Sequence, residues 1–520
     1  MSDSKEQKNQ KQGGQTRHEE TEHSDPRQAR LEKLASLRGM GVNPYPYGFK
    51  PSHEISTVLD EGDALLEAET EVALAGRIMA MREMGKAAFA HIKDNHSRIQ
   101  IYVRQDTVPE ADWGVFGLCD LGDHLGVHGT IMRTKTGELT LRATRLELLS
   151  KAIRPLPVPK VETRDGVEVV HDEVRDVEFR YRQRYADLAL NNDVAAVFRK
   201  RSLILQTVRE YLMEHGYLEV ETPTLQPIYG GAAASPFVTH HNALNMRLYM
   251  RIATELYLKR LVIGGINRVF EIGKDFRNEG IDRSHNPEFT MVEFYEAYAD
   301  YNDMMVHFEG IYERCALAVH GSTRFPFQGQ EIDVKTPWRR LTMAGALKEF
   351  AGIDFNALDD NAVQALLKEK GLEMAGPYNR GLAQAVLFEE LCEPQLIQPV
   401  FITDFPRETT PLAKAHRDDP ALVERFEPYI AGWEVGNAYS ELNDPQVQES
   451  LLREQASARD AGDEEAHPYD ADFIRAMEYG MPPMGGIGMG LDRMVMLLLD
   501  QPNIRDVIFF PTMRMEEGLG

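Results

Sequence analysis

The feature that most constrains this chain is a predicted β-hairpin at residues 269–301, because one of its faces carries charged side chains. Apolar and polar residues alternate along the first strand, and the two-residue period of a strand sends them to opposite faces. Turn-forming residues fill 281–287, and a second alternating strand follows. The hairpin therefore presents four polar side chains towards one shared space: Arg277, Glu279, Glu293 and Tyr295.

Two interpretations fit this charged face. Charged side chains are rarely buried unless they are paired or bound to a ligand. The hairpin can form a solvated sheet surface with cross-strand ion pairs, which is the favoured interpretation for a lone hairpin. It can also form the wall of a cleft, in which the arginine binds an anion and the carboxylates bind a cation.

The length of 520 residues predicts two or more domains, and 42% hydrophobic residues are enough to build their cores. The polar N-terminus is not a secretory signal, and the apolar run 494–499 is far too short to cross a membrane, so we expect a cytoplasmic protein. Three scattered cysteines, Cys119, Cys315 and Cys392, predict buried thiols rather than disulfides. The formal net charge of −24 disfavours a nucleic-acid partner unless basic residues gather locally.

The N-terminal part divides into a polar segment and a β-rich segment. Residues 1–28 are expected to form a disordered tail. Between 29 and 156, a helical pattern precedes five short alternating segments, which predict a small β-barrel of the OB type. Within it, basic residues outnumber acidic ones around Phe89 and Tyr102. This composition fits a surface that binds single-stranded nucleic acid, and it equally fits aromatic rings that fill the barrel beneath an ordinary basic surface.

A proline-containing linker and hinge is expected at 157–188, followed by a second domain at 189–520. That domain begins with an amphipathic helix over 194–215 and contains a small helical insertion at about 335–395. Glu255 lies in another helical segment, where it is either an exposed partner of Lys259, four residues on, or a ligand group.

Two later segments carry polar groups or glycines in predicted strands. The strand period puts Val435, Asn437, Tyr439 and Glu441 on one face. A glycine-rich strand at 485–490 then leads into an apolar helix that contains Arg493. Glycines that merely allow packing look the same, so this signal is weak by itself. The P-loop pattern is absent from the sequence, which excludes that class of nucleotide site.

The residues of the hairpin also carry a family resemblance. FRNEG, a short loop and HNPEFTMVEFY closely resemble motif 2 of the class II aminoacyl-tRNA synthetases. The helix and strand that end at Pro223 resemble motif 1, the dimer element of that class, and the glycine-rich strand with Arg493 resembles motif 3. Residues 76–103 are similar to the anticodon-binding OB domain of the lysyl-tRNA synthetases and their aspartyl and asparaginyl relatives.

This resemblance spans roughly residues 27–514 and is greatest to the bacterial-type class II lysyl-tRNA synthetases. It implies an α+β fold, in which an antiparallel catalytic sheet flanked by helices is preceded by an OB-fold β-barrel. It implies activation of L-lysine with ATP to lysyl-adenylate and pyrophosphate, and transfer of lysine to the 3′ end of tRNA(Lys). It further implies bound Mg²⁺ and a homodimer formed through the motif 1 helix and strand.

The resemblance also assigns roles to single residues. Arg277 and Arg493 would be catalytic, and Arg277 would bridge the amino-acid carboxylate and the ATP α-phosphate, a task suited to its planar fork. Lysine would contact Gly231, Glu255, Arg277, Glu293, Tyr295, Asn437, Tyr439 and Glu441. ATP would contact Arg277, Glu279, His285, Asn286, Phe289, Glu434 and Arg493. Mg²⁺ would be bound by Glu427 and Glu434, and the anticodon by Arg77, Phe89 and Gln100.

The choice of amino acid also has a physical side. A lysine site must neutralise two ammonium groups and one carboxylate, and an aspartate or asparagine site would need a cation or amide where Glu441 stands. A buried carboxylate without a partner costs several kcal/mol, so neutral side chains would be rejected. The alternatives are an aspartyl/asparaginyl-type synthetase and a non-catalytic RNA-binding paralogue, which predicts damaged motifs. The chain departs from its relatives at Ser235, Ser284, Trp433 and Met484.

Overall fold

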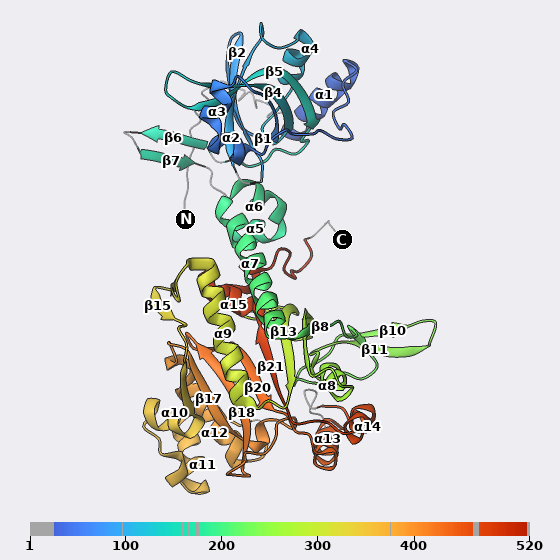
Figure 1. Ribbon diagram of the computed structural model, residues 1–520, viewed down its shortest axis with the longest axis vertical. Helices are drawn as coiled ribbons and strands as arrows, with labels where there is room; N and C mark the ends of the chain where they lie inside the picture. Colours follow the sequence, from blue (N-terminus) through green and yellow to red (C-terminus); the bar gives the residue numbers. More distant parts are fainter. Residues whose placement is uncertain are drawn as a thin grey trace, which may run out of the picture. The chain divides into compact units, whose positions relative to one another are not determined.

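The computed structural model describes residues 25–516, apart from 96, 159, 165–166, 172–175, 375 and 461–466. The chain divides into two compact units, Met1–Arg175 and Asp176–Gly520, which are coloured blue to teal and green to red in Figure 1. The expected tail at 1–28 lies outside the described residues up to residue 24, and the first helix begins at Pro26. No helix among the described residues has the length and apolar character needed to cross a membrane.

The first unit is built on a closed five-stranded barrel with the strand order β1-β2-β3-β5-β4. Its interior is filled by aliphatic side chains such as Leu74, Ile92, Ile101, Val127 and Leu141, each fully buried. The prediction of an OB-type barrel is therefore confirmed. The strands are β1 (Glu71–Met84), β2 (Ala87–Lys93), β3 (Arg98–Arg104), β4 (His124–Arg133) and β5 (Leu139–Ser150), with a separate pair β6 (Lys160–Arg164) and β7 (Val167–His171). The helices are α1 (Pro26–Gly39), α2 (Ile55–Asp60), α3 (Gly62–Glu67) and α4 (Glu110–Phe116).

The second unit is built around a mixed sheet of nine strands. Most neighbouring strands are antiparallel, as expected, and the pairs at its two ends, β16 with β17 and β12 with β8, are parallel. In order across the sheet, the strands are β16 (Arg339–Thr342), β17 (Val400–Pro406), β18 (Leu422–Ile430), β20 (Gly436–Ser440), β21 (Met484–Gly490), β13 (Glu288–Ala297), β12 (Arg268–Phe276) and β8 (Leu218–Glu219), while β19 (Trp433–Glu434) pairs with β18.

Helices surround this sheet, and smaller strand pairs lie beside it (Figure 1). The helices are α5 (Val177–Arg182), α6 (Arg184–Leu190), α7 (Asn192–Glu214), α8 (Glu255–Ile263), α9 (Tyr301–His320), α10 (Met343–Phe350), α11 (Asp360–Lys370), α12 (Arg380–Leu391), α13 (Pro445–Asp460), α14 (Ala471–Glu478), α15 (Leu491–Leu498) and α16 (Ile504–Val507). The smaller sheets contain β9 (Leu225–Gln226), β10 (Val238–His241) and β11 (Met246–Met250), and β14 (Arg324–Phe327) with β15 (Gln330–Asp333).

One face of the sheet is covered by α7, α9 and α15, and this is where the main core lies. Helix α9 is held at both ends by its sequence: Asp300 and Asp303 form a capping box, and Gly321 adopts the left-handed conformation that ends it. Fully buried Phe270 and Phe294 are opposite each other on β12 and β13 and point into this core. The alternate residues of the same two strands consequently face the other side of the sheet.

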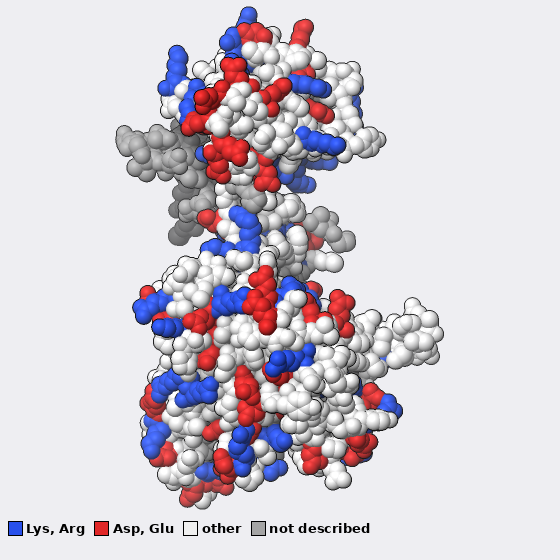
Figure 2. All heavy atoms as spheres, in the orientation of Figure 1, with Lys and Arg blue, Asp and Glu red and all other residues white. Residues whose placement is uncertain are grey.

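The predicted hairpin is thus confirmed, with β12 and β13 as its strands. On the face away from α7, α9 and α15, the cross-strand pairs are Glu271 with Glu293 and Asp275 with Phe289. The surface of the protein does not repeat this concentration of charge. On the faces seen in Figure 2, acidic and basic side chains are interspersed, so the net charge of −24 forms no single acidic patch there.

Candidate functional site

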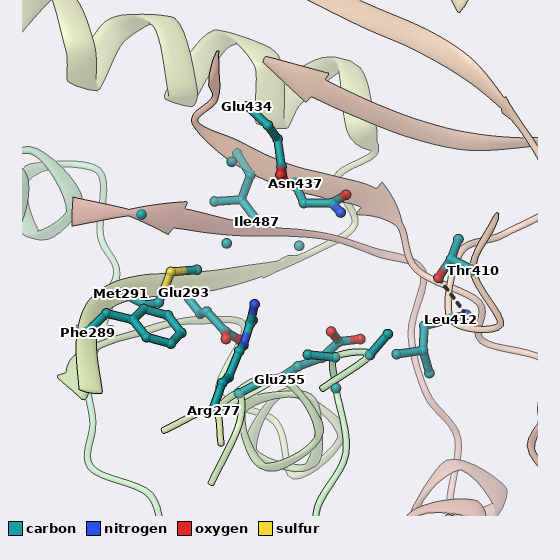
Figure 3. A pocket seen from close by; sticks show the side chains of 18 of the residues that line it. Glu255, Arg277, Phe289, Met291, Glu293, Thr410, Leu412, Glu434, Asn437 and Ile487 are labelled. Atoms are coloured by element: carbon teal, nitrogen blue, oxygen red, sulfur yellow. Dashed lines mark hydrogen bonds between the residues drawn. The ribbon is translucent and has the colours of Figure 1, made fainter. Parts of the chain in front are cut away.

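The face of the nine-stranded sheet away from α7, α9 and α15 forms the floor of a cavity of about 420 Å³. Side chains reach it from β13, β20 and β21, from the start of α8, from the loop between β12 and β13, and from α15. In the close view of Figure 3, Arg277, Glu293 and Glu255 lie on one side of the cavity, and Glu434 and Asn437 lie on the other. The charged face of the hairpin is therefore a cleft wall, and the alternative of a solvated surface is wrong.

Two glycines of the central strand β21 leave space for the polar side chains on its neighbours. Gly488 pairs with Glu293 on one side and Asn437 on the other, and Gly486 pairs with Tyr295 and Tyr439. A Cβ atom at Gly486 would lie 2.3 Å from the Tyr295 ring, a distance that no real contact allows. The glycines of this strand therefore keep the cavity floor free of side chains.

The Arg277 guanidinium lines the cavity and forms no ion pair with a carboxylate of the described residues. It lies over the Phe289 ring, with its central carbon 5.0 Å from the ring centroid. Its Nε is buried and has no hydrogen-bond partner among the described residues. The backbone on both sides is fixed, because the Arg277 amide donates to the Pro287 carbonyl and the Asn278 amide donates to that of Ser235. An arginine held in this way is available to an anionic ligand.

Two buried carboxylates also line the cavity. Glu255 is 5% exposed and Glu441 only 1% exposed, and both line the cavity. Between them lies the fully buried ammonium group of Lys259, 2.5 Å from an oxygen of each. The second oxygen of Glu441, Oε1, is buried and has no hydrogen-bond partner within the described part of the chain.

Glu293 also lines the cavity, and two hydrogen bonds hold its carboxylate. The Thr254 amide donates to its Oε1 at 3.1 Å, and the Tyr295 hydroxyl donates to its Oε2 at 3.2 Å. The lone pairs of the Tyr295 hydroxyl oxygen remain available to a donor such as an ammonium group. Gly231, also at the cavity, has a φ of +90°, and a Cβ atom there would lie 2.9 Å from the Glu255 side chain.

The electrostatics of the cavity show an excess of negative charge. Burial, followed by the nearby charges of Asp275 and Glu255, raises the pKa of Glu293 to about 8. Burial also raises the pKa of Glu441 to about 8, while Lys259 acts in the opposite direction. Burial and Glu427 raise the pKa of Glu434 to about 7. A cationic ligand would relieve this cost, because it favours the ionised form of every one of these groups.

A second cluster brings together residues from three separate segments. Arg493 on α15 donates to the Glu434 carbonyl at 2.6 Å and lies 3.2 Å from the imidazole Nε2 of His285. The other ring nitrogen of His285 is 2.8 Å from a carboxylate oxygen of Asp282. The buried Oδ1 of Asn286 has no hydrogen-bond partner among the described residues. Arg493 and His285 thus offer donors to a polyanionic ligand, while the Asn286 Oδ1 and the carboxylate of the exposed Glu279 offer acceptors to its neutral donor groups.

The two predicted metal ligands differ in their availability. Glu434 lines the cavity, but Glu427 does not, because both of its oxygens are held by Arg425 and Tyr429. Glu427, Glu434 and Glu393 nevertheless lie close enough to repel one another, and burial with these two neighbours raises the pKa of Glu393 to about 7. Uncompensated carboxylate oxygens suit a hard divalent cation such as Mg²⁺. Among the described residues, no three His, Cys, Asp or Glu side chains already form a ready metal site.

In the first unit, the predicted nucleic-acid residues lie on the outside of the barrel. The Phe89 and Tyr102 rings pack against each other, with centroids 4.7 Å apart, on the face opposite the buried Ala88 and Ala90. The interpretation that the rings fill the barrel is therefore wrong. Gln100 lies on the same outer face and exchanges hydrogen bonds with Glu138 and Thr140. The Arg77 guanidinium donates to the Gly122 carbonyl at 3.0 Å.

The structure thus gathers the predicted lysine and ATP residues around one cavity, and of the predicted second-unit residues only Glu427 does not line it. Sequence reasoning missed other residues. The sequence predicts Lys259 only as the partner of an exposed Glu255, whereas both side chains are buried; their i,i+4 spacing is the signal for the pair. Asp492 was not singled out, yet it joins the three motifs: it accepts hydrogen bonds from Arg201 on α7 at 2.6 Å and from the Thr290 amide on β13 at 2.7 Å.

Comparison with known proteins agrees with this geometry. Residues 176–514 match the family of class II tRNA synthetases (D, K and N), and residues 72–149 match the OB-fold nucleic acid binding domain. The chain is 49% identical over 487 residues to a lysine–tRNA ligase of Thermoanaerobacter pseudethanolicus, covering 93% of this chain and 95% of the relative. It is 50% identical over 492 residues to a lysine–tRNA ligase of Pelotomaculum thermopropionicum, covering 94% of each. The chain therefore belongs to the lysine–tRNA ligase family of class II tRNA synthetases.

Proposed function

We propose that this protein activates L-lysine with ATP and transfers the lysyl group to the 3′ end of tRNA(Lys). One observation carries the choice of amino acid: buried carboxylates line the same cavity as an arginine that forms no ion pair within the part of the chain that the structure describes. This arrangement matches a molecule with a carboxylate at one end and ammonium groups elsewhere. The overall identity to two lysine–tRNA ligases supports the same conclusion.

Lysine would bind with its carboxylate on Arg277. Its α-ammonium would donate to Glu255 and to the backbone carbonyl of Gly231, both at the cavity wall. Its ε-ammonium would donate to the free Oε1 of Glu441 and to the Tyr295 hydroxyl oxygen. Glu293, Asn437 and Tyr439 would complete the walls of the cavity.

This orientation accounts for the rejection of other amino acids. Aspartate would bring a second carboxylate towards Glu441, and asparagine would leave that carboxylate without a cation. An uncompensated buried carboxylate costs several kcal/mol, so either substrate would be disfavoured by a large factor. The aspartyl/asparaginyl alternative therefore has no support in the cavity.

In the first step, a carboxylate oxygen of lysine would attack the α-phosphorus of ATP. A new phosphorus–oxygen bond forms, the α–β phosphoanhydride bond breaks, and pyrophosphate leaves. The attacking carboxylate needs no general base, so the residues contribute position and charge neutralisation. Arg277 would neutralise the α-phosphate, while His285 and Arg493 would hold the remaining phosphates, and Glu279, Asn286 and Phe289 would hold the nucleoside. In the second step, a hydroxyl of the terminal tRNA ribose attacks the lysyl carbonyl carbon and AMP leaves.

The acidic groups beside Arg493 fit Mg²⁺, which would neutralise phosphate charge when bound. Glu434 would hold the ion, and Glu427 would join it by exchanging its contact with Arg425. The raised pKa of Glu434 supports this assignment, because burial and Glu427 leave that carboxyl with an unfavourable negative charge in the free protein.

The OB-fold unit would bind the anticodon of tRNA(Lys). The half-buried Phe89 ring on the outer face would stack on a base, and Gln100 and Arg77 would hydrogen-bond base edges. An enzyme of this kind works in the cytoplasm, and the three cysteines fit its reducing conditions because all are buried and unpaired.

The motif 1 elements would form a homodimer interface. Leu203 and Met213 on α7 and Leu218 on β8 are 39%, 57% and 52% exposed, which is unusual for large apolar side chains in neighbouring elements. A second copy of the chain would cover them. Leu218→Glu should convert the dimer to a monomer in analytical ultracentrifugation, and an unchanged sedimentation coefficient would contradict this interface.

The decisive experiment for the activity is ATP–pyrophosphate exchange measured with each amino acid in turn. Lysine alone should stimulate exchange. Stimulation by aspartate or asparagine would favour the related synthetase, and no stimulation by any amino acid would favour an RNA-binding paralogue. Aminoacylation of tRNA(Lys) then tests the second step.

A further inference from the structure

Lys259 is a buried cation that lies next to the cavity without lining it. It projects from α8 one turn after Glu255, and its side chain has no exposed surface. Burial alone lowers the pKa of a lysine, but the adjacent carboxylates of Glu255 and Glu441 reverse this effect and raise the pKa above its ordinary value. The Lys259 ammonium therefore stays charged at neutral pH.

Lys259 contacts one oxygen of each carboxylate and leaves the other oxygen of Glu441 available to a ligand. The ammonium donates to Oε1 of Glu255 and lies at the same distance, 2.5 Å, from Oε2 of Glu441. The free oxygen of Glu441, Oε1, is on the side of the cavity, since a Cβ atom on Gly486 would lie 2.1 Å from it. The Lys259 ammonium thus connects Glu255, which would receive the α-ammonium group of the substrate lysine, with Glu441, which would receive its ε-ammonium group.

We propose that Lys259 is a positioning and specificity-determining residue, whose ammonium fixes Glu255 and Glu441 and sets the charge of the cavity to match lysine. This inference rests on the proposed lysine orientation. Around the proposed lysine position, the carboxylates of Glu255, Glu293 and Glu441, once ionised, outnumber the cations Lys259 and Arg277 by one. Lysine with two ammonium groups and one carboxylate carries one net positive charge, so binding of lysine with these carboxylates ionised balances the charges of this group.

Without Lys259 the same cavity would carry two uncompensated negative charges. Its best ligand would then be a dication such as pentane-1,5-diamine, which has both ammonium groups of lysine but no carboxylate. Other groups face Lys259 and do not replace it. The Tyr295 ring lies 5.9 Å from its nitrogen, and the buried His467 is neutral at physiological pH, because burial and Lys259 lower its pKa to about 4.

The test compares two ligands in wild-type protein and in Lys259→Met. The Michaelis constant for lysine in ATP–pyrophosphate exchange is measured together with the inhibition constant of pentane-1,5-diamine at pH 8.5. In Lys259→Met, the Michaelis constant for lysine should rise roughly 10- to 100-fold with little change in kcat, because charge-assisted contacts are lost. The inhibition constant of pentane-1,5-diamine should rise by a smaller factor or fall. The ratio of the Michaelis constant for lysine to this inhibition constant should therefore increase in the variant.

Controls separate this role from packing. Leu258→Met changes an equally buried neighbour on α8 and should leave the ratio unchanged. Lys259→Arg keeps the charge and should retain the wild-type ratio, whereas Lys259→Gln keeps a donor without the charge and should behave like Lys259→Met. An unchanged ratio in Lys259→Met, or a wild-type ratio in Lys259→Gln, overturns the inference.

The role of Lys259 can also be tested in the wild-type protein, so that this test does not depend on the folding of a variant. Among the described residues, only Lys151 and Lys259 are buried lysines, so ¹⁵Nζ-lysine labelling should show two slowly exchanging ammonium signals. Both signals should persist when unlabelled lysine saturates the protein, and loss of one would show that the substrate displaces Lys259. If wild-type exchange does not respond to lysine at all, the proposed function fails instead.

Discussion

A Cβ atom on Gly486 would lie 2.1 Å from Oε1 of Glu441, the carboxylate oxygen that the cavity leaves free. Gly486→Ala should therefore displace Glu441 and raise the Michaelis constant for lysine by about 100-fold or more, while the constant for ATP changes little. Steady-state ATP–pyrophosphate exchange measures both constants. Gly485→Ala is the matched control, since its Cβ would meet Met304 and Asp300 on the helix-covered face instead. It should lower the melting temperature without a selective effect on lysine.

Lysine binding should release protons near neutral pH. The carboxyls of Glu293 and Glu441 have pKa values of about 8 in the free protein and are partly protonated at pH 7. The ammonium groups of lysine favour the ionised forms, so the bound complex holds fewer protons and apparent affinity rises between pH 6.5 and 8.5. Titration calorimetry in two buffers of different ionisation enthalpy counts the released protons. Proton uptake, or affinity that falls over this range, would contradict the assignment.

The same pKa values predict how lysine stabilises the fold. A folded-state pKa raised from 4.5 to about 8 means that the folded protein binds protons more tightly than the unfolded chain, so the free energy of unfolding of the ligand-free protein falls across this range as pH rises. Bound lysine favours the ionised carboxylates and so removes this loss of stability at high pH. The rise in melting temperature produced by saturating lysine should therefore be larger at pH 8.5 than at pH 6.5 in differential scanning fluorimetry.

Arg493 should act on ATP and not on lysine. Its guanidinium contacts the Glu434 carbonyl and His285, and neither of these contacts involves the carboxylates Glu255 and Glu441. Arg493→Met should raise the Michaelis constant for ATP and lower kcat by about 100-fold, as expected for loss of a phosphate-binding arginine, with unchanged lysine binding by calorimetry. Arg324→Met is a suitable control, because Arg324 pairs with Glu331 and Asp333 on the surface strands β14 and β15.

Phe89 should matter for tRNA and not for adenylate formation. Phe89→Ala removes the outer-face ring that would stack on an anticodon base, worth about 1–3 kcal/mol, or roughly 5- to 150-fold in the Michaelis constant for tRNA(Lys). Aminoacylation measures this loss, and pyrophosphate exchange should not change. Phe49→Ala, which removes a ring packed on His128 of β4, controls for general damage to the barrel. An equal effect of both variants would count against the anticodon role of Phe89.

The sequence predicted the hairpin and the shared face of Val435, Asn437, Tyr439 and Glu441 because both follow from the two-residue strand period. It did not predict the parallel strands at the sheet ends, since β8 and β16 have only two and four residues and carry almost no pattern. The bounds of the domains expected from the sequence stay predictions.

Within the site, the sequence does not predict which charged residues are buried and which neighbours enclose them. The spacing of Glu255 and Lys259 predicts a helical ion pair but not that strand β13 and the segment after β20 enclose it. Glu427 has the right chemistry for a metal ligand, yet Arg425 and Tyr429 already hold its oxygens. Arg425 and Tyr429 are each two positions from Glu427 on the same strand. Whether their side chains bind its carboxylate depends on the twist and pleat of the sheet.

The central claim is that the Glu441 carboxylate selects the ε-ammonium group of the substrate, and binding of lysine and norleucine tests it most directly. Norleucine has the six-carbon skeleton of lysine and keeps the α-amino acid group but lacks the terminal ε-ammonium. Calorimetry should show wild-type protein binding lysine at least about 100-fold more tightly than norleucine, and Glu441→Gln losing most of that preference. Glu309→Gln, at a buried carboxylate that instead accepts from the Trp338 amide, should keep it. A preference for lysine that survives in Glu441→Gln would contradict the account.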